Sequence, residues 1–240
     1  MLPILLALVA SAGQPQSADA SQATSNGQPD PASQISRVAP PSGEDISERP
    51  GPDGPLYSAG DVATDTKLPV GYPRPTPPGA IEIKVYPSIR QAEFSGDGDG
   101  TGASRGGFMP LFNHISSNGI AMTAPVEMRY SDTDDDGTTD GWTMAFLYHT
   151  TEDGPTGDDG PVEVIDTEPL TVISIGIQGG RDFTEINAAS AKLEAWLDES
   201  DDWASAGDMR SLGYNGPYTP IANRWWEVQI PVRRVETDGG

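Results

Sequence analysis

The stretch of residues 107–126 is the feature that most constrains how this chain can fold. Its first half spaces apolar residues as on one face of a helix, at Phe108, Leu111, Phe112 and Ile115. Asn118-Gly119 predicts the end of that helix, because both residues tolerate the left-handed conformation found at helix C-termini. The run Ile120–Val126 then predicts the start of a strand. A short helix followed directly by a strand is typical of domains that pack helices on a sheet.

The region from Ala80 onward repeats the same order of elements twice. Periodicity predicts helices over 104–117 and 183–199, and strands over 81–94, 120–130, 142–148, 162–178, part of 201–214, and 224–232. Asp182 and Glu185 form the D-x-x-E pattern of a capping box at the start of the second helix. Two strand-helix-strand-strand units indicate an internal duplication and an α+β fold, with helices on one side of an antiparallel sheet. The opposite face would then be free to form a small-molecule cleft.

The N-terminal third differs in composition from the rest. Residues 1–12 are apolar and end in Ala10-Ser-Ala12, which resembles a signal peptide with its cleavage site and favours a secreted or periplasmic protein. Twelve apolar residues are too few for a membrane span, which needs about 20. Residues 13–78 are rich in Pro, Gly, Ser and Asp and predict a disordered tail, with possible docking points at Leu56-Tyr57 and 67–70. The folded domain is expected over 79–235, followed by a tail over 236–240.

Charge and cysteine content exclude several classes of function. The chain has 36 Asp and Glu against 14 Lys and Arg, a formal net charge of -22. Nucleic acids and anionic membrane surfaces are therefore not expected as partners, because both require clusters of basic residues. The chain has no Cys, which excludes disulfides, thiolate metal sites and covalent haem attachment.

Three separate stretches resemble one known family. Residues 107–126, containing Ala121-Met-Thr-Ala-Pro-Val126, are similar to the signature of the SOUL haem-binding proteins, and so are Pro217-Tyr-Thr-Pro220 and the strand Asn223–Val232. The resemblance covers residues 80–234 and implies a duplicated, distorted β-barrel with two outer helices, related to GyrI-like effector-binding domains. It also implies non-covalent binding of haem or another tetrapyrrole, a hydrophobic small molecule, without known catalysis.

Few residues could serve a haem site. The two histidines, His114 and His149, are the candidate axial ligands. Helical geometry places His114 away from the apolar face, at a boundary or on the surface. The family's coordinating His lies near the first strand, and residues 81–94 contain none. The alternative is haem buried in an apolar cleft, with a propionate on Arg90 or Arg129.

The last strand suggests a second kind of site. Alternation places Trp225 and Glu227 together on the face opposite the helices. A Glu beside Trp can bind a cation, or its pKa can rise by desolvation so that it acts as an acid. In GyrI-like relatives a Glu at the matching place lies in the ligand cleft, so one alternative is a hydrolase that uses Glu227 with Tyr148 or Tyr214. The structural alternative is a Glu exposed to solvent or paired with Arg129 or Arg224.

A third hypothesis is that the protein is a non-catalytic interaction module on a flexible stalk. No Ser/His/Asp set, phosphate loop or HExxH motif is present in the sequence, so an enzyme is not favoured.

An acidic loop is the candidate metal site. Its ligands would be Asp132, Asp134, Asp136, Thr138 and Asp140, in the pattern D-x-D-x-D-G-x-x-D. Calcium prefers six to eight oxygen ligands, and alternating Asp residues around a Gly turn can provide them. Thr143 stands where a bidentate Glu would complete a calcium loop. The sequence therefore predicts a calcium-braced hairpin, with a solvated acidic turn as the alternative.

Overall fold

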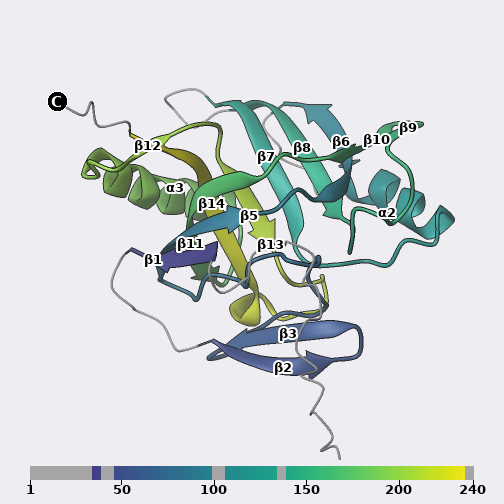
Figure 1. Ribbon diagram of the computed structural model, residues 1–240, viewed down its shortest axis with the longest axis horizontal. Helices are drawn as coiled ribbons and strands as arrows, with labels where there is room; N and C mark the ends of the chain where they lie inside the picture. Colours follow the sequence, from purple (N-terminus) through teal and green to yellow (C-terminus); the bar gives the residue numbers. More distant parts are fainter. Residues whose placement is uncertain (1–33, 39–45, 99–105, 134–138, 236–240) are drawn as a thin grey trace, which may run out of the picture.

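The structure, a computed structural model, describes residues 34–38, 46–98, 106–133 and 139–235 (Figure 1). The main sheet has eleven strands: β1 (Ile35–Arg37), β5 (Ile81–Tyr86), β6 (Arg90–Asp97), β7 (Val126–Thr133), β8 (Thr139–Leu147), β9 (Gly157–Asp159), β10 (Val162–Asp166), β11 (Leu170–Gln178), β12 (Trp203–Ser205), β13 (Arg210–Gly213) and β14 (Trp225–Arg234). The helices are α2 (Phe108–Ser117), α3 (Phe183–Asp198) and the 3-10 turn η2 (Ile221–Asn223). A smaller sheet contains β2 (Ser47–Gly51), β3 (Gly54–Ala59) and β4 (Val62–Ala63). The predicted signal peptide, residues 1–12, and the tail 236–240 lie outside the described residues.

The main sheet confirms the predicted duplication. Its central order is β5-β11-β14-β13-β7-β8-β6-β10. The two halves of the chain are β5-β6-α2-β7-β8 and β10-β11-α3-β13-β14. The order is symmetric about the β13–β7 pair, because each strand of one half has its counterpart from the other half at the same distance from that pair. Each half also gives its first strand to the other, because β5 pairs with β11 and β10 pairs with β6. The fold is therefore α+β, an open and strongly bent antiparallel sheet with two helices.

Alternation along β14 separates the two faces of the sheet as predicted. Trp226, Val228 and Ile230 belong to the core beneath the helices, together with Leu193 of α3. Trp225 belongs to a second core on the opposite face. Figure 1 shows α3 beside β14 and α2 beside β6 and β10, so the helices cover separate parts of the same face. None of the described helices is long and apolar enough to cross a membrane.

Local signals explain where the helices begin and end. The side chain of Asp182 accepts a hydrogen bond from the backbone N–H of Glu185, and the Glu185 side chain accepts one from Asp182, so the predicted capping box is present. Helix α2 ends at Ser117, with Asn118 as its C-cap and Gly119, with φ of 66°, directly after it, as the sequence indicates. The strands predicted over 81–94 and 162–178 are each two strands, with Pro87 and Pro169 between them. Proline cannot donate a ladder hydrogen bond, so pairing changes partner at these positions.

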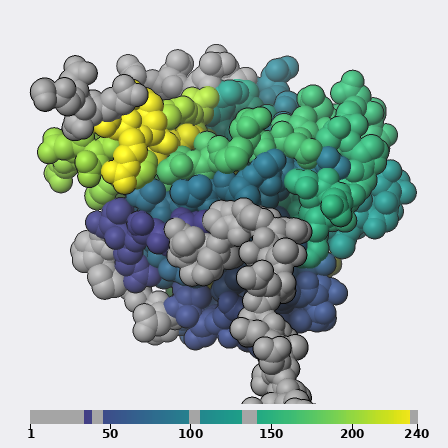
Figure 2. Space-filling model, viewed as in Figure 1, coloured from purple at the N-terminus to yellow at the C-terminus, as the bar shows by residue number. Residues whose placement is uncertain are grey.

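Residues 46–80 correct the expectation of a disordered tail and of a free sheet face. Strands β2–β4 form a small sheet, and residues 64–80, here called the strap, run across the face opposite the helices. Leu68, Tyr72 and Thr76 of the strap are buried there, and Leu56 of the hairpin is also buried. Leu56 and Leu68 belong to the two expected docking points. In Figures 1 and 2 the β2–β3 hairpin lies against the lower end of the main body.

Disorder was wrongly expected for residues 46–80 because their ordered structure comes from contacts with the rest of the chain. Composition predicts disorder when a segment cannot bury enough apolar surface by itself. The strap contributes little surface of its own but docks on a preformed face. Its prolines also restrict φ before folding, which lowers the entropy lost on docking.

Candidate functional site

Glu227 lies at the centre of a sealed polar network beneath the strap. Its side chain is 0% exposed and pairs with the equally buried Lys84, with 2.9 Å between Nζ and Oε1. Oε1 also accepts hydrogen bonds from the backbone N–H of Thr76 at 2.6 Å and from the Tyr214 hydroxyl at 2.8 Å. Oε2 accepts from Ser174 Oγ at 2.5 Å and from Gln229 Nε2 at 2.6 Å.

This network corrects the expected role of Glu227 as an acid of raised pKa. Burial by itself would raise its pKa, but the charge of Lys84 and the hydrogen bonds from Ser174 and Thr76 hold it below its ordinary value. The carboxylate is therefore ionised, and every one of its near neighbours is already a donor. Trp225 packs beside it and donates its indole N–H to the Thr76 carbonyl at 2.8 Å. The residues arranged here hold the strap on the sheet and leave no room for a substrate.

The two proposed partners of Glu227 in catalysis are placed differently. Tyr214 contacts it directly. Tyr148 belongs to the core on the helix face, and its hydroxyl lies 2.7 Å from His114 Nε2. The pairing of Glu227 with Arg129 or Arg224 is also not formed, since Lys84 takes that position.

A larger cavity, here called the Trp226 cleft, opens beside α2 and has a volume of about 570 Å³. This size lies within the range of about 300–1,000 Å³ that is usual for small-molecule sites. Its apolar wall comes from α2, β7, β8 and β14 and includes Phe108, Met122, Val126, Met144 and Trp226. The cleft therefore adjoins the 107–126 stretch from which the fold was predicted.

Two arginines line the same cleft without a carboxylate partner. Arg224 donates from Nε to the Thr219 carbonyl at 2.9 Å and from Nη2 to the Pro217 carbonyl at 3.0 Å. Within the part of the chain that the structure describes, no acidic side chain forms an ion pair with Arg224 or Arg181.

Arg181 owes its position to two glycine features. It follows Gly179, whose φ of 119° turns the chain between β11 and α3. A Cβ on Gly213 would lie 2.9 Å from Arg181 Nη1, so glycine at 213 allows the guanidinium to lie against β13. Burial lowers the pKa of Arg181 from its usual value, and the nearby charge of Arg224 acts in the same direction. A bound anion would offset both effects.

The indole N–H of Trp226, a residue that lines this cleft, is a further group without a partner. Trp226 is 1% exposed, and its Nε1 has no acceptor among the described residues. Native proteins leave few buried donors unpaired. The Trp226 cleft thus combines an apolar wall, the unpaired donor of Trp226 and two arginines with one carboxylate, Asp65. Asp65 already accepts hydrogen bonds from Asn215, Gly216 and Thr219, so the two arginines leave an excess of positive charge that suits a flat apolar molecule with carboxylate groups.

His114 is buried, and its ring nitrogens are both engaged away from either cavity. Nδ1 lies 2.6 Å from Asp159 Oδ2, and Nε2 lies 2.7 Å from the Tyr148 hydroxyl. Hydrogen bonds from His114 and Asn118 lower the pKa of Asp159, so Asp159 is ionised and His114 Nδ1 must carry a proton. His114 was expected at a boundary or on the surface; it is 8% exposed, and its ring ties α2 to β9.

The remaining predicted haem residues also have other partners. His149 Nδ1 lies 3.3 Å from the Leu68 carbonyl of the strap. Arg90 forms a two-point ion pair with Asp166, at 2.8 and 2.7 Å. Arg129 pairs with Glu93 and lies 3.6 Å from Glu127. The structure does not bring these residues together with Trp225 and Glu227 into one site.

The predicted calcium loop joins β7 to β8, as a hairpin should. Residues 134–138 lie outside the described residues, and so do the side chains of Asp132 and Asp140. Among the described side chains there is no group of three or more potential metal ligands. Calcium binding therefore stays a prediction from the sequence.

Sequence reasoning missed Arg181 and the strap contacts. Arg181 had a weak signal, since Gly179-Gly180 followed by a capping box predicts a tight turn that presents the next side chain. The position of Thr76 over Glu227 had no signal, because these residues are 151 positions apart.

Comparison with known proteins agrees with this fold. No curated protein sequence matches the chain. The EcmrR C-terminal domain has a TM-score of 0.54 at 15% identity over 65% of this chain and 98% of that one. An EcmrR chain in a DNA complex has a TM-score of 0.54 at 14% identity over 65% of this chain, which spans 57% of that chain. An uncharacterized conserved protein from Listeria innocua has a TM-score of 0.51 at 14% identity, over 65% and 94% of the two chains.

At these identities the structural likeness shows the fold alone, and it agrees with the expected relation to GyrI-like domains. The sequence itself is matched over residues 74–231 by the family model for SOUL heme-binding proteins, and the chain therefore belongs to the SOUL haem-binding protein family.

Proposed function

We propose that this protein binds haem or a related tetrapyrrole non-covalently in the Trp226 cleft. The observation that carries the proposal is the pair Arg181 and Arg224, which line an apolar cleft of about 570 Å³ without carboxylate partners. A tetrapyrrole has a flat apolar ring system and carboxylate side chains, so its two chemical parts match the two parts of the cleft. Membership of the SOUL family supports the same ligand class.

The residues of the cleft have distinct roles in this proposal. The ring system packs against Phe108, Met144 and the indole of Trp226, where burial of apolar surface contributes about 25 cal/mol per Å². The propionates pair with Arg181 and Arg224. Hydrogen bonds to charged groups contribute about 1.5–3 kcal/mol each. Because the protein carries a large net negative charge, we expect a dianionic ligand to bind only where these two cations offset that charge.

No histidine lines the Trp226 cleft among the described residues. Binding is therefore expected to depend on burial and charge, with no imidazole holding the iron. It follows that metal-free protoporphyrin should bind with an affinity close to that of haem. A protein that relied on axial histidine would strongly prefer the iron complex.

The test is a spectroscopic titration of the full chain with haem and with protoporphyrin. We expect saturable one-to-one binding of both, with dissociation constants within about fivefold of each other. Arg181→Gln should weaken both by about tenfold, because it removes one charge-assisted contact of about 1.4 kcal/mol or more. Arg233→Gln on the exposed end of β14 removes the same charge outside the cleft and serves as the matched control.

Two outcomes would count against the proposal. One is a linear, non-saturating change in absorbance with added tetrapyrrole, which indicates non-specific association. The other is an equal loss of affinity in the Arg181→Gln and Arg233→Gln proteins, which would assign the effect to overall charge and not to the cleft.

A further inference from the structure

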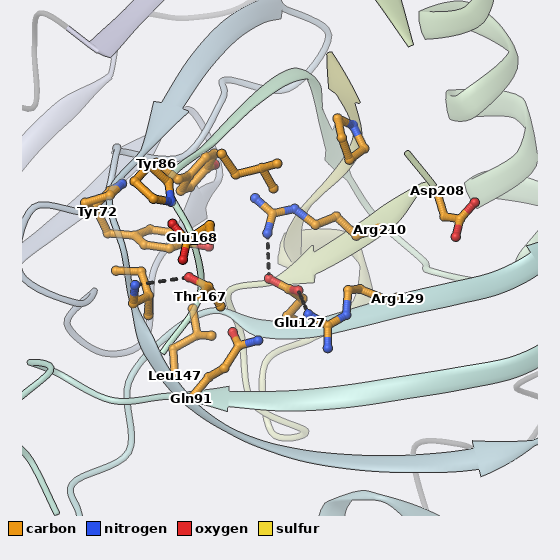
Figure 3. Close-up of a pocket in the computed structure, with 15 residues that line it drawn as sticks. Tyr72, Tyr86, Gln91, Glu127, Arg129, Leu147, Thr167, Glu168, Asp208 and Arg210 are labelled. Carbon is orange, nitrogen blue, oxygen red and sulfur yellow. Dashed lines mark hydrogen bonds and ion pairs between the residues drawn. The ribbon is translucent and has the colours of Figure 1, made fainter. Parts of the chain in front are cut away.

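A second and smaller cavity lies on the other face of the sheet, under the strap. This Arg210 cavity has a volume of about 270 Å³ and is lined by residues of the strap, β5–β8, β11, β13 and β14. Figure 3 shows Glu127 between Arg210 and Arg129, joined to each by a dashed line, with Tyr72 and Tyr86 across the cavity. Its position does not overlap the Trp226 cleft, since the two cavities share no lining residue.

Three polar atoms of the cavity wall are buried without a hydrogen-bond partner. They are the hydroxyl of Tyr72, Oε1 of Glu127 and Nη2 of Arg210, in residues that are 5%, 2% and 8% exposed. Of the four such side-chain atoms in the described part of the chain, three thus belong to residues that line this one cavity. Native structures pair nearly all buried polar atoms, and a cluster of orphans at a cavity points to a bound molecule.

The positions of two of these atoms restrict the chemistry of that molecule. Arg210 uses Nη1 to bind Glu127 Oε2 at 2.9 Å and Nε to bind Gln229 Oε1 at 2.9 Å. Nη2 of Arg210 has no hydrogen-bond acceptor, and Oε1 of Glu127 has no hydrogen-bond donor, with Arg129 Nη1 3.6 Å away from it. Both atoms belong to one ion pair, and the first needs an acceptor and the second a donor. A single group that carries a donor and an acceptor side by side, such as an amide, satisfies both.

Charge excludes the two simplest ionic ligands. A carboxylate would face Glu127 and also Glu168 and Asp208, which line the cavity. An ammonium group would face the guanidinium groups of Arg129 and Arg210. A neutral ligand meets neither repulsion and leaves the Arg210–Glu127 ion pair intact.

The remaining walls suit a flat ring. Tyr72 and Tyr86 form an edge-to-face pair with centroids 4.7 Å apart, and the Arg210 guanidinium lies 4.9 Å from the centroid of Tyr86. Ile89, Leu147 and Leu170 complete the apolar lining. At about 30 Å³ for each water molecule, the cavity holds the equivalent of roughly nine waters, so one ring with one substituent fills it.

We infer that the Arg210 cavity is a binding site for a small neutral planar amide, either a single-ring carboxamide or a lactam. The amide nitrogen donates to Glu127 Oε1, and the amide oxygen accepts from Arg210 Nη2. The Tyr72 hydroxyl supplies a further hydrogen bond, and the ring lies between the tyrosines and the aliphatic wall. This inference is independent of the tetrapyrrole proposal, because it concerns another cavity.

The test compares three probes of similar size and shape on the full chain: benzamide, benzoate and benzylammonium. Ligand-observed NMR and calorimetry should show saturable one-to-one binding of benzamide and at least tenfold weaker binding of both ions. Tyr72→Phe keeps the ring and removes one hydroxyl, so it should weaken benzamide severalfold. Tyr218→Phe, at a 98% exposed tyrosine outside both cavities, is the matched control and should bind as the wild type does.

A second variant tests the location without touching a buried charge. Leu170 lines the cavity and is only partly buried, so Leu170→Trp should fill the entrance and abolish benzamide binding. Equal or tighter binding of benzoate or benzylammonium would overturn the assignment to neutral amides. Absence of saturable binding for all three probes would show that the cavity holds water only. Binding unchanged by Leu170→Trp would place the probe outside the cavity, and either result would overturn the site.

Discussion

The backbone N–H of Thr76 lies 2.6 Å from Oε1 of Glu227. Thr76 is in the Pro-rich strap and Glu227 is in the last strand of the sheet, so the strap caps a carboxylate that is 0% exposed. The strap takes the place that a ligand would need to reach Glu227. Glu227 lines neither of the two cavities described above, one of which lies beside α2 and the first residues of the strap and the other under Tyr72 of the strap.

Removal of the Glu227 charge should strongly destabilise the fold. Glu227→Gln leaves Lys84 buried without its counter-ion, and breaking a buried pair from one side costs about 3–5 kcal/mol. Urea denaturation followed by tryptophan fluorescence would measure the change in the free energy of unfolding. Glu163→Gln, at an exposed position in β10, makes the same substitution on a strand and should change stability by less than about 0.5 kcal/mol.

A double variant separates loss of the pair from loss of packing. Lys84→Met combined with Glu227→Gln removes both charges, and it should recover a large part of the stability lost in Glu227→Gln alone. If the double variant is less stable than Glu227→Gln, the ion pair is not the source of the effect.

The Lys84–Glu227 ion pair also predicts how the free energy of unfolding depends on pH. The pKa of Glu227 is below its ordinary value of 4.5 in the folded protein. As pH falls through 4.5, this carboxylate is therefore protonated earlier in the unfolded chain than in the folded one. The stabilisation that the ionised Glu227 provides above pH 4.5 is lost as pH falls from 4.5 towards its lower pKa in the folded protein. The wild type should lose up to about 1.4 kcal/mol per pH unit more than the double variant in this range. Denaturation midpoints between pH 6 and pH 3 would measure both slopes, and parallel slopes would contradict the assignment.

Much of this architecture was predictable because it rests on local pattern. The alternation of Trp226 and Val228 with Glu227 set the two faces of β14, and the capping box of Asp182 set the start of α3. The strap was not predictable, since its order comes from contacts such as Thr76 with Glu227, far apart in sequence. The partners of the candidate haem ligands were not predictable for a related reason: composition cannot show that His114 is already held by Asp159 and Tyr148.

Docking of the strap should depend on a glycine in β11. A Cβ on Gly176 would lie 2.1 Å from the Thr76 carbonyl oxygen and 2.3 Å from that of Pro77. Because these are backbone atoms, Gly176→Ala should displace the strap and raise proteolysis and amide exchange within residues 64–80. Gly106→Ala is the control, since its added Cβ would meet only ring atoms of Trp142 at 3.6 Å. Equal proteolysis of both variants would mean that the strap is held by other contacts.

The histidines should not govern tetrapyrrole affinity. His114 and His149 line neither cavity, so His114→Ala and His149→Ala should each leave the dissociation constant for haem within about twofold of wild type. His114→Ala should still lower stability, by about 1–3 kcal/mol, because the Tyr148 hydroxyl is left buried without its partner. The two readouts are a Soret titration and urea denaturation of the same proteins. A shifted Soret maximum with a large loss of haem affinity in either variant would instead identify that histidine as an axial ligand and would move the proposed site away from Trp226.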